Sequence, residues 1–209
     1  MQGFSSQECS TVFIVDDDAS VLRSLTRMFQ LEGYTVESFD HPRKLLARGP
    51  GGRPGCVVLD LRMPELNGLE LQAELRRAGW KQPILFISGH GDVPAAVKAM
   101  KAGAVDFLPK PVGTAELLEA VERALAQDRA AIGSELEREA LRLRFAALSP
   151  REREVCQWVA RGLLSKQIAA ELGTAEQTVR QQRVRVMEKL SVDSVPALVR
   201  LLERLGAPP

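Results

Sequence analysis

The sequence contains no apolar run long enough to cross a membrane, and residues 1–10 lack the basic start and apolar block of a secretory leader. Its 3 cysteines lie in unrelated contexts without the spacing of metal ligands, which indicates reduced thiols with structural roles. Internal repeats and low-complexity tracts are also missing. These absences argue against a membrane-spanning protein, a disulfide scaffold and a cysteine-based metal site, and we expect a cytoplasmic protein.

The composition is typical of a globular protein, with 45% apolar and 26% charged residues, and 209 residues suffice for one large or two small domains. A net charge of +1 conceals a difference between the ends of the chain. Residues 1–130 carry 15 Lys and Arg against 17 Asp and Glu, whereas residues 146–209 carry 10 against 7. An acidic first part and a basic second part predict two functions, with nucleic acid a candidate partner of the second.

Four short apolar segments each end beside residues that a phosphoryl-transfer pocket uses. They are residues 12–15 before Asp16-Asp17-Asp18, residues 56–59 before Asp60, residues 83–87 before Ser88, and residues 105–108 shortly before Lys110. Three of these segments are continuous apolar runs, as in strands buried on both faces of a parallel sheet. Because ligands bind beyond the carboxyl ends of such strands, we expect the polar groups to meet in one pocket.

Each of these groups has a chemical role in such a pocket. Asp16, Asp17 and Asp60 supply the hard oxygen ligands that Mg²⁺ prefers, and one carboxylate can act as the nucleophile that forms an acyl phosphate. Ser88 and Lys110 are suited to binding phosphoryl oxygens. Taken alone, each residue also fits a helix cap, a turn or an exposed loop, but their order along the chain favours the pocket.

The chain between and after these segments has the apolar periodicity of further elements. These are a strand over 35–39 and helices over 20–32, 41–48, 69–78, 93–102 and 114–127. The alternation of strands and helices predicts five parallel strands with helices on both faces, connected right-handedly.

The last of these helical patterns scarcely pauses from Ala115 to Leu143. This stretch lacks proline and is rich in Ala, Leu, Glu and Arg, and Gly133-Ser134 is its only weak point. A long or once-broken helix between two domains is therefore predicted rather than a flexible tether, with a solvated spacer as the alternative.

The start of the second part contains signals for two helices. Ser149, Pro150 and Glu152 match an N-cap, a first helical position and a capping box, and an apolar stripe follows them. Ser165 is then expected to cap a short helix over 166–172.

A longer basic helix is predicted next. Gly173 indicates a turn, and Thr174 with Gln177 predicts a second capping box that opens a helix over 175–190. A short helix joined through glycine to a longer one is the plan of a helix-turn-helix. The polar side chains of the longer helix suit DNA phosphates and base edges, although a solvated polar face is the alternative. These candidates are Arg180, Gln181, Gln182, Arg183, Arg185 and Lys189.

Over about residues 10–130 the sequence closely resembles the receiver domain of two-component response regulators. The matching motifs are Val15-Asp16-Asp17-Asp18, Leu59-Asp60-Leu61-Arg62-Met63-Pro64 with Asn67-Gly68, Ile87-Ser88-Gly89, and Asp106-Phe107-Leu108-Pro109-Lys110-Pro111. This resemblance implies that Asp60 accepts phosphate from a sensor histidine kinase, with Mg²⁺ as the cofactor. Asp17 and Asp60 would bind the metal directly, Asp16 largely through water, and the backbone carbonyl of Arg62 would complete the protein ligands.

The same resemblance implies how phosphorylation is sensed. Ser88 and Phe107 match the paired switch positions, and Lys110 matches the invariant lysine of the family. The bond between Lys110 and Pro111 is usually cis in receivers. Residues 93–102 and 105–108 form the surface that usually mediates receiver dimerisation.

About residues 145–205 resemble a LuxR-type DNA-binding domain. The matching motifs are Leu148 to Val155, Gly162-Leu163, Lys166 to Ala169, Leu172-Gly173, Thr178-Val179 and Glu188-Lys189-Leu190. The resemblance adds Lys166 and Thr178 to the candidate DNA contacts. Gln182 is a departure, because the family commonly has histidine at this position, and the contact made there is in doubt.

The two resemblances together identify a regulator of the NarL/FixJ type, nearer the FixJ branch by its segment Ser88-Gly89-His90-Gly91-Asp92. The predicted fold is α/β followed by all-α: a flavodoxin-like receiver at 1–128, a helical linker at 129–145 and a helix-turn-helix domain at 146–209. The expected protein is not an enzyme in its own right. It accepts phosphate, dimerises, binds double-stranded promoter DNA and acts on RNA polymerase.

One enzymatic alternative remains open at this point. Asp16-Asp17-Asp18-Ala19-Ser20 also matches a D-x-D-x-S pattern and resembles the nucleophile loop of haloacid-dehalogenase-type phosphatases. In that family Asp16 would be the nucleophile and Asp18 the acid and base, which leaves Asp60 and residues 145–205 without a role.

Overall fold

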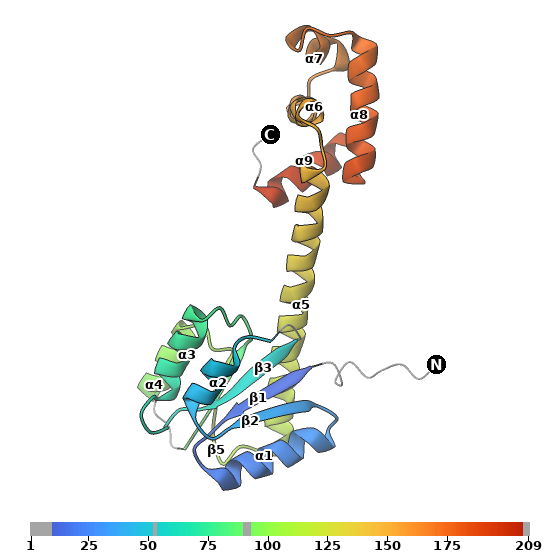
Figure 1. Cartoon of the computed structure of the whole chain (residues 1–209). Coiled ribbons are helices and arrows are strands. Elements are labelled where there is room, and N and C mark those ends of the chain that lie inside the picture. Colours follow the sequence, from blue (N-terminus) through green and yellow to red (C-terminus); the bar gives the residue numbers. More distant parts are fainter. Residues whose placement is uncertain (1–9, 52–53, 90–92, 207–209) are drawn as a thin grey trace, which may run out of the picture. The chain divides into compact units, whose positions relative to one another are not determined.

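The computed structural model describes residues 10–51, 54–89 and 93–206 (Figure 1). The chain forms two compact units, residues 1–132 and residues 133–209, and their boundary falls inside the predicted linker at 129–145. Among the described residues, no helix has both the length and the apolar character needed to span a membrane.

The first unit alternates strands and helices, as the sequence predicts. Its elements are β1 (Thr11–Val15), α1 (Ala19–Leu31), β2 (Thr35–Phe39), α2 (Pro42–Arg48), β3 (Gly55–Asp60), α3 (Gly68–Arg77), β4 (Ile84–Gly89), α4 (Val93–Lys101), β5 (Asp106–Lys110) and the first part of α5 (Thr114–Ala146). The strands form one parallel sheet in the order β2-β1-β3-β4-β5. This order confirms the predicted flavodoxin-like fold.

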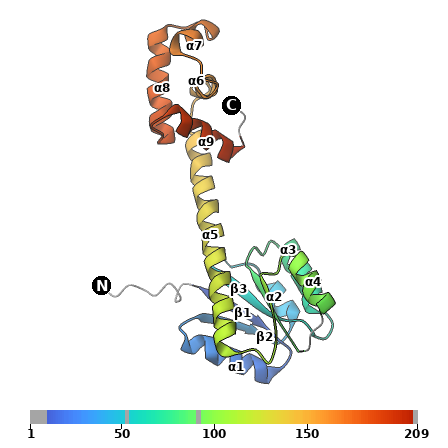
Figure 2. The same ribbon diagram turned by 180° about the vertical axis from the view of Figure 1, so that it is seen from behind.

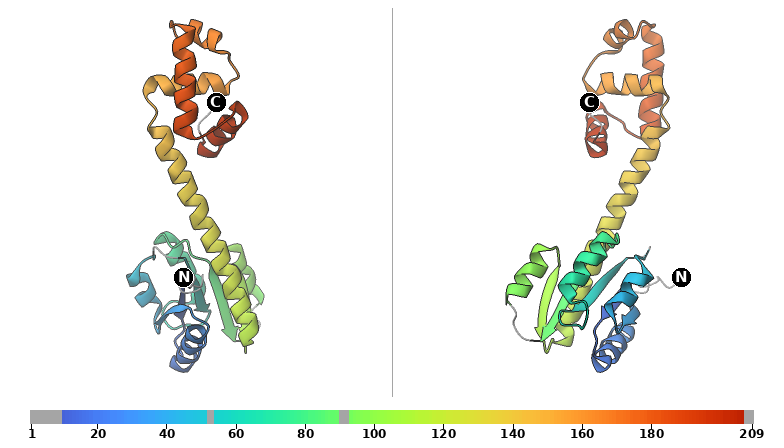
Figure 3. Two further views of the ribbon diagram at one scale, coloured as in Figure 1. Left: turned by 90° about the vertical axis from the view of Figure 1, so that its right-hand side faces the viewer. Right: turned by 60° about the vertical axis from the view of Figure 1, so that its left-hand side comes forward.

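Helices cover both faces of this sheet (Figures 2 and 3). Side chains of α1 and α5, such as Phe29 and Val121, pack on one face, whereas side chains of α2, α3 and α4, such as Leu45 and Leu75, pack on the other. Every residue of β1 and β3 is buried, and the edge strand β2 is partly exposed. The continuous apolar runs of the sequence are therefore the central strands, because both of their faces meet helices.

The loop after β3 approaches the strand end closely. Gly68 opens α3, and a Cβ atom at this position would lie 2.5 Å from the carbonyl oxygen of Asp60. Only glycine allows this approach. Asn67 caps α3 and forms a capping box with Glu70, so the start of the helix is fixed beside the strand end.

The helix α5 continues without interruption through Gly133 and Ser134. The long form of the predicted linker helix is therefore observed and the once-broken form is not. A single glycine costs about 1 kcal/mol in a helix, which the strong helix formers around it offset.

The second unit consists of the end of α5 and four further helices, α6 (Pro150–Ala160), α7 (Ser165–Glu171), α8 (Glu176–Leu190) and α9 (Val195–Leu205). Its core includes Val155, Ile168 and Leu198, and Leu141 and Phe145 of α5 pack against it. The predicted capping box at the start of α6 is confirmed, because Ser149 and Glu152 bond to each other's backbone N–H groups.

Two other capping predictions are wrong. Ser165 lies inside α7, whose N-cap is Leu164, and the side chain of Gln167 accepts the Leu164 N–H at 2.8 Å. Thr174 does not cap α8: the N-cap of α8 is Ala175, and the N–H of Thr174 bonds to the carbonyl of Ala169 at the end of α7. The helix α8 therefore begins one residue later than predicted, after Ala175 and without a side-chain cap.

Candidate functional site

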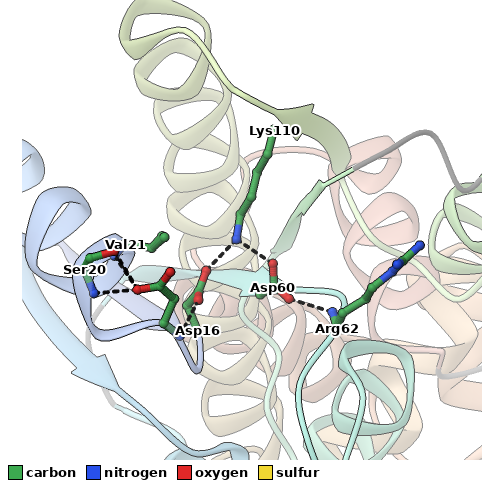
Figure 4. A network of polar contacts seen from close by, with 7 residues as sticks. Asp16, Ser20, Val21, Asp60, Arg62 and Lys110 are labelled. Carbon is green, nitrogen blue, oxygen red and sulfur yellow. Dashed lines mark hydrogen bonds and ion pairs between the residues drawn. The ribbon is translucent and has the colours of Figure 1, made fainter.

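Two carboxylates and one amine from three strand ends meet at one edge of the sheet (Figure 4). Asp16 follows β1, Asp60 ends β3 and Lys110 ends β5. The Lys110 Nζ donates to Asp16 Oδ2 at 2.7 Å and to Asp60 Oδ1 at 2.6 Å. The structure thus brings together three of the predicted pocket residues, which are widely separated in the sequence. The Lys110–Pro111 bond is cis, as expected.

The two carboxylates are buried, Asp16 at 3% and Asp60 at 7% exposure. Burial raises the pKa of Asp60, and hydrogen bonds from Lys110 and from the backbone N–H of Arg62 oppose this shift. Burial alone lowers the pKa of Lys110, but the bonds to both carboxylates outweigh it, so that pKa is raised. With every group ionised, the cluster carries one negative charge in excess, which attracts a further cation.

Asp60 is held on both of its oxygens. The backbone N–H of Arg62 donates to its Oδ2 at 2.6 Å, while Lys110 binds its Oδ1. Figure 4 shows that the Arg62 side chain points away from the charged cluster. The carboxylate therefore has a fixed orientation before any ligand arrives.

The third predicted metal ligand stands apart from this cluster. Asp17 is exposed, and within the described residues no three acidic, histidine or cysteine side chains are grouped as ligands of one ion. The donor chemistry nevertheless fits Mg²⁺, because Asp16 and Asp60 provide buried hard oxygens with a net negative charge and Asp17 is adjacent in sequence.

Ser88 is fully buried near the end of β4, and none of the described residues forms a hydrogen bond with its Oγ. A buried hydroxyl without a partner is costly, and a ligand that accepts a hydrogen bond would remove the cost. Phe107 on β5 is half-buried and stacks on Phe86 with ring centroids 6.1 Å apart. Phe86 and Phe107 pack on the sheet face that α4 helps to cover, and Ser88 shares that face because strand side chains alternate.

The remaining aspartate of the triplet has a structural role. Asp18 caps α1, because its Oδ1 accepts from the backbone N–H of Ser20 at 2.7 Å and from the Ser20 hydroxyl at 2.6 Å. The bond to the Ser20 hydroxyl lowers the pKa of Asp18. A carboxyl group held in this way is poorly suited to donating a proton, which disfavours the D-x-D-x-S interpretation. The last three residues of the FixJ-like segment that begins at Ser88, residues 90–92, lie outside the described residues.

The predicted DNA contacts lie on or near α8 in the second unit. Lys166, at the start of α7, is exposed, and so are Thr178, Arg180, Gln181 and Arg185 of α8. The guanidinium of Arg180 pairs with Glu176 one turn earlier at 2.7 Å. Such exposed pairs contribute little to stability, so Arg180 is available to another partner.

Three of the predicted contacts are less accessible. Arg183 and Gln182 are half-buried, and the enclosed Gln182 Oε1 accepts no hydrogen bond from the part of the chain that the structure describes. Lys189 is exposed in part, but its amine bonds to the buried carboxylate of Glu152 at 2.7 Å. Lys189 therefore links the end of α8 to the start of α6, a role that the sequence did not indicate.

Val184 is a surface residue that sequence reasoning missed. Its side chain is 56% exposed, and it lies two positions from the buried Val186, on the solvent side of α8. The signal was present in the sequence, because a valine interrupts the polar positions of this face. Exposed methyl groups on such a helix suit the methyl group of thymine.

Comparison with known families identifies both units. Residues 12–122 match the family described as response regulator receiver domain, and residues 146–202 match the luxR family of bacterial regulatory proteins. Among curated proteins, the chain is 47% identical over 195 residues to nodulation protein W of Bradyrhizobium diazoefficiens, covering 93% of this chain and 86% of that protein.

Two further similarities extend over nearly the whole chain. The transcriptional regulatory protein FixJ of Bradyrhizobium diazoefficiens is 42% identical over 195 residues, which cover 93% of this chain and 95% of that protein. The low-resolution structure of the response regulator StyR has a TM-score of 0.85 and 44% identity, covering 93% of this chain and 98% of that one. The strand-end cluster and the helix-turn-helix thus have the same two-domain setting as in these proteins, and the chain belongs to the NarL/FixJ-type response regulators, the transcriptional regulators of two-component systems.

Proposed function

We propose that Asp60 accepts a phosphoryl group from a sensor histidine kinase and that this event controls binding of the second unit to promoter DNA. The observation that carries the proposal is the buried cluster of Asp60, Asp16 and Lys110 together with the unpartnered hydroxyl of Ser88. These groups supply a nucleophile, a cation and a free hydrogen-bond donor at one sheet edge. We also propose that the protein is a regulator and not a phosphatase, because Asp18 serves as a helix cap.

Asp60 is the best-placed acceptor among the aspartates. Its strand, β3, lies between β1, which leads to Asp16, and β4, which carries Ser88. A carboxylate oxygen of Asp60 attacks the phosphorus atom of the phosphohistidine, the phosphorus–nitrogen bond breaks, and the imidazole leaves and takes up a proton. The product is an acyl phosphate on Asp60.

The other residues stabilise the added charge. Lys110 already bonds to Asp60 and can bond to a phosphoryl oxygen, and the Ser88 hydroxyl gains the acceptor that it lacks. Asp60, Asp17 and Asp16, with the Arg62 carbonyl, would hold Mg²⁺. When bound, the ion neutralises charge on the carboxylates and on the phosphoryl group.

The signal leaves the pocket over the face that α4 covers. Ser88 and Phe107 share this face, so a shift of Ser88 towards the phosphoryl group leaves space for Phe107 to move. The outer side of α4 exposes Val93, Val97 and Met100, which recur at helical spacing. This apolar stripe supports the proposal that two phosphorylated receivers dimerise there.

A receiver dimer brings two copies of α8 to the same DNA. Helix-turn-helix dimers read two half-sites whose separation follows the dimer geometry. The exposed Arg180, Gln181 and Arg185 are the proposed contacts to phosphates and base edges, and RNA polymerase is the proposed partner at the promoter. Phosphorylation shifts the populations of two receiver conformations. The free energy of this shift equals the difference between the free energies with which the two conformations interact with the phosphoryl group.

The acceptor assignment is tested by incubating the protein with acetyl phosphate and Mg²⁺ and mapping the modification by mass spectrometry. The expected result is one phosphoryl group on the peptide that contains Asp60, none in Asp60→Asn, and wild-type acceptance in the control Asp40→Asn, an exposed aspartate of the same unit. Modification of Asp16 in the Asp60→Asn protein would contradict the proposal.

A further inference from the structure

The last part of α5, residues 133–146, presents an apolar surface that no described residue of its unit covers. Leu136 is 67% exposed and Leu143 is 64% exposed, and their spacing of seven residues places them on the same side of the helix. Leu141 and Phe145 lie on the opposite side and pack on the core of the unit. The two exposed leucines are therefore not needed for the fold of this unit. The segment that carries them is the yellow end of α5 in Figure 1.

Charged residues flank the two leucines on both sides, with acidic residues towards the start of the helix and basic residues towards its end. Glu135 and Arg142 lie on one flank, and Glu137 and Arg144 lie on the other. On each flank the acid precedes the base by seven residues, the same spacing as that of the leucines. Within the described residues, Glu135 and Arg144 have no ion-pair partner, and Arg142 reaches only Glu139 at 3.5 Å. Glu137 forms an exposed ion pair with Arg204 of α9 at 2.9 Å, which it would exchange for Arg144 of the second copy.

We propose that this surface pairs in antiparallel orientation with the same surface of a second copy of the chain. In that orientation Leu136 of one copy meets Leu143 of the other, and the contact occurs twice because the pair has twofold symmetry. The same rotation brings Glu135 of one copy beside Arg142 of the other on one flank. On the other flank it brings Glu137 beside Arg144.

The charge order selects this orientation over a parallel pair. In a parallel pair in register, each flank of one copy faces the opposite flank of the other, so Glu135 lies near Glu137 of the other copy and Arg142 lies near Arg144. Like charges at one level repel. The antiparallel pair replaces this repulsion with attraction on both flanks.

The pairing is weak, because only two leucines from each copy are buried and the ion pairs are exposed. A dissociation constant of about 10 to a few hundred micromolar is expected. The pairing is a property of the unphosphorylated chain and does not depend on Asp60. Its test is therefore made with the full-length Asp60→Asn protein, which keeps the outcome separate from that of the proposed phosphorylation.

The first measurement is sedimentation equilibrium of this protein over a range of concentrations. Replacement of both leucines, Leu136→Gln with Leu143→Gln, is expected to weaken the association at least about tenfold. The matched control is Leu31→Gln on α1, which removes a leucine that is 77% exposed and should leave the association unchanged. Equal association of the double variant and the control would overturn the proposal.

A charge-reversal cycle then tests the partners. Glu135→Arg and Arg142→Glu should each weaken the association about two- to fivefold, and the two substitutions together should restore it. Restoration requires that Glu135 of one copy meets Arg142 of the other. Additive losses in the combined variant would overturn the antiparallel arrangement.

Disulfide cross-linking decides the orientation. In a Cys9→Ser background, Cys56 and Cys156 are buried, so an introduced cysteine is the accessible one. A mixture of Leu136→Cys and Leu143→Cys proteins should form the mixed disulfide and little of either symmetric one. Predominant linking of Leu136→Cys to itself indicates a parallel pair and would overturn the proposal, as would linking that does not exceed that of a Leu31→Cys control.

Discussion

The hydroxyl of Ser88 is buried and has no hydrogen-bond partner among the residues that the structure describes, an arrangement that lowers stability until a ligand accepts its hydrogen bond. Ser88→Ala should therefore leave the free energy of unfolding unchanged or raise it by about 1 kcal/mol. The same variant should hold less phosphoryl group at steady state, because one hydrogen bond to it is lost. Urea unfolding and the phosphorylated fraction measure the two effects.

Ser88→Thr is the matched variant, since it keeps the hydroxyl group. It should retain phosphorylation even where the additional methyl group lowers stability in this fully buried position. A Ser88→Ala protein that is clearly destabilised but phosphorylated like wild type would show that the hydroxyl serves the fold alone.

Arg180 is an exposed residue of α8 that can contact either a base edge or a phosphate, and the two kinds of contact predict different effects of its removal. If it reads a guanine edge, Arg180→Ala should cost about 1–3 kcal/mol of binding free energy and relax preference at one base position. If it binds phosphate, affinity should fall for all sequences and the salt dependence should decrease by about one ion. Binding to a site selected from random DNA, measured at several salt concentrations, separates the two.

The control for Arg180 is Arg200→Ala, which removes an exposed arginine of α9 in the same unit. Binding by the Arg180 variant that matches this control at every salt concentration would remove Arg180 from the DNA interface.

Single residues differ in how far the sequence could predict them. Asp16, Asp60 and Lys110 were predictable because each directly follows or ends an apolar strand, and parallel strands end at one edge. The missing partner of Ser88 and the link between Lys189 and Glu152 were not predictable. Both depend on side-chain positions that only tertiary packing determines.

At the scale of elements, a buried carboxylate holds α5 against the start of β3. Asp128 is 4% exposed, and its Oδ2 accepts the backbone N–H of Gly55 at 2.9 Å. Burial raises the pKa of Asp128, and the bond from Gly55 opposes this only in part. The folded chain therefore binds this proton more tightly than the unfolded chain does. The stabilising effect of the protonated Asp128 on the fold is complete below the ordinary pKa of aspartate, about 4. It is lost as pH rises through the raised pKa that Asp128 has in the folded chain.

Asp128→Asn should make stability depend less on pH over this window. The amide oxygen still accepts the Gly55 N–H, and no charge is buried at neutral pH. We expect the variant to lose less stability than wild type as pH rises from 4 to 8, because only wild type then carries a buried charge at this position. Urea unfolding at both pH values is the measurement, with the exposed Asp40→Asn as control. A loss of stability at pH 8 would contradict this account of the carboxylate.

A second inter-element contact concerns the DNA-binding unit. Lys189 of α8 donates to Glu152, whose carboxylate also completes the capping box of α6. That bond is the largest cause of the lowered pKa of Glu152, so its stabilising effect is present above the ordinary pKa of glutamate and is lost as pH falls. Lys189→Met should destabilise this unit by about 1–3 kcal/mol, because a buried carboxylate loses its partner.

Thermal unfolding of Lys189→Met at pH 7 and pH 4 measures that contribution. The difference from wild type should shrink as pH falls, because the charge on Glu152 that Lys189 stabilises is lost as this carboxyl group takes up a proton. Full stability together with weakened DNA binding would show that Lys189 contacts DNA instead of supporting the fold.

Elements were predictable where apolar periodicity and a turn signal coincide, as for the five strands and for α6. The start of α8 was misplaced because Thr174 and Gln177 have the spacing of a capping box, whereas the structure has its N-cap at Ala175 without a side-chain bond. The helix α9 was overlooked, although Ser194 caps it and Leu198, Leu201 and Leu202 recur at helical spacing. The exposure of Leu136 and Leu143 could not be inferred, because the same leucine pattern also fits a buried helix.

At the scale of the whole molecule, the chain joins a receiver domain to a LuxR-type DNA-binding domain. Each unit has a core of its own. In the proposed function, phosphorylation acts on DNA binding through a change in assembly. The exposed stripe of α4 provides the surface for such a change in the account given above.

The most direct test of that account is the affinity of full-length protein for a selected DNA site, measured with and without acetyl phosphate and Mg²⁺. Wild type should bind at least about tenfold more tightly with the phosphodonor, within the usual range of coupling between two sites. Asp60→Asn should bind with one weak affinity under both conditions. An equal gain in affinity for wild type and Asp60→Asn, or no gain in a wild-type protein shown to be phosphorylated, would contradict the claim that the phosphoryl group on Asp60 controls DNA binding.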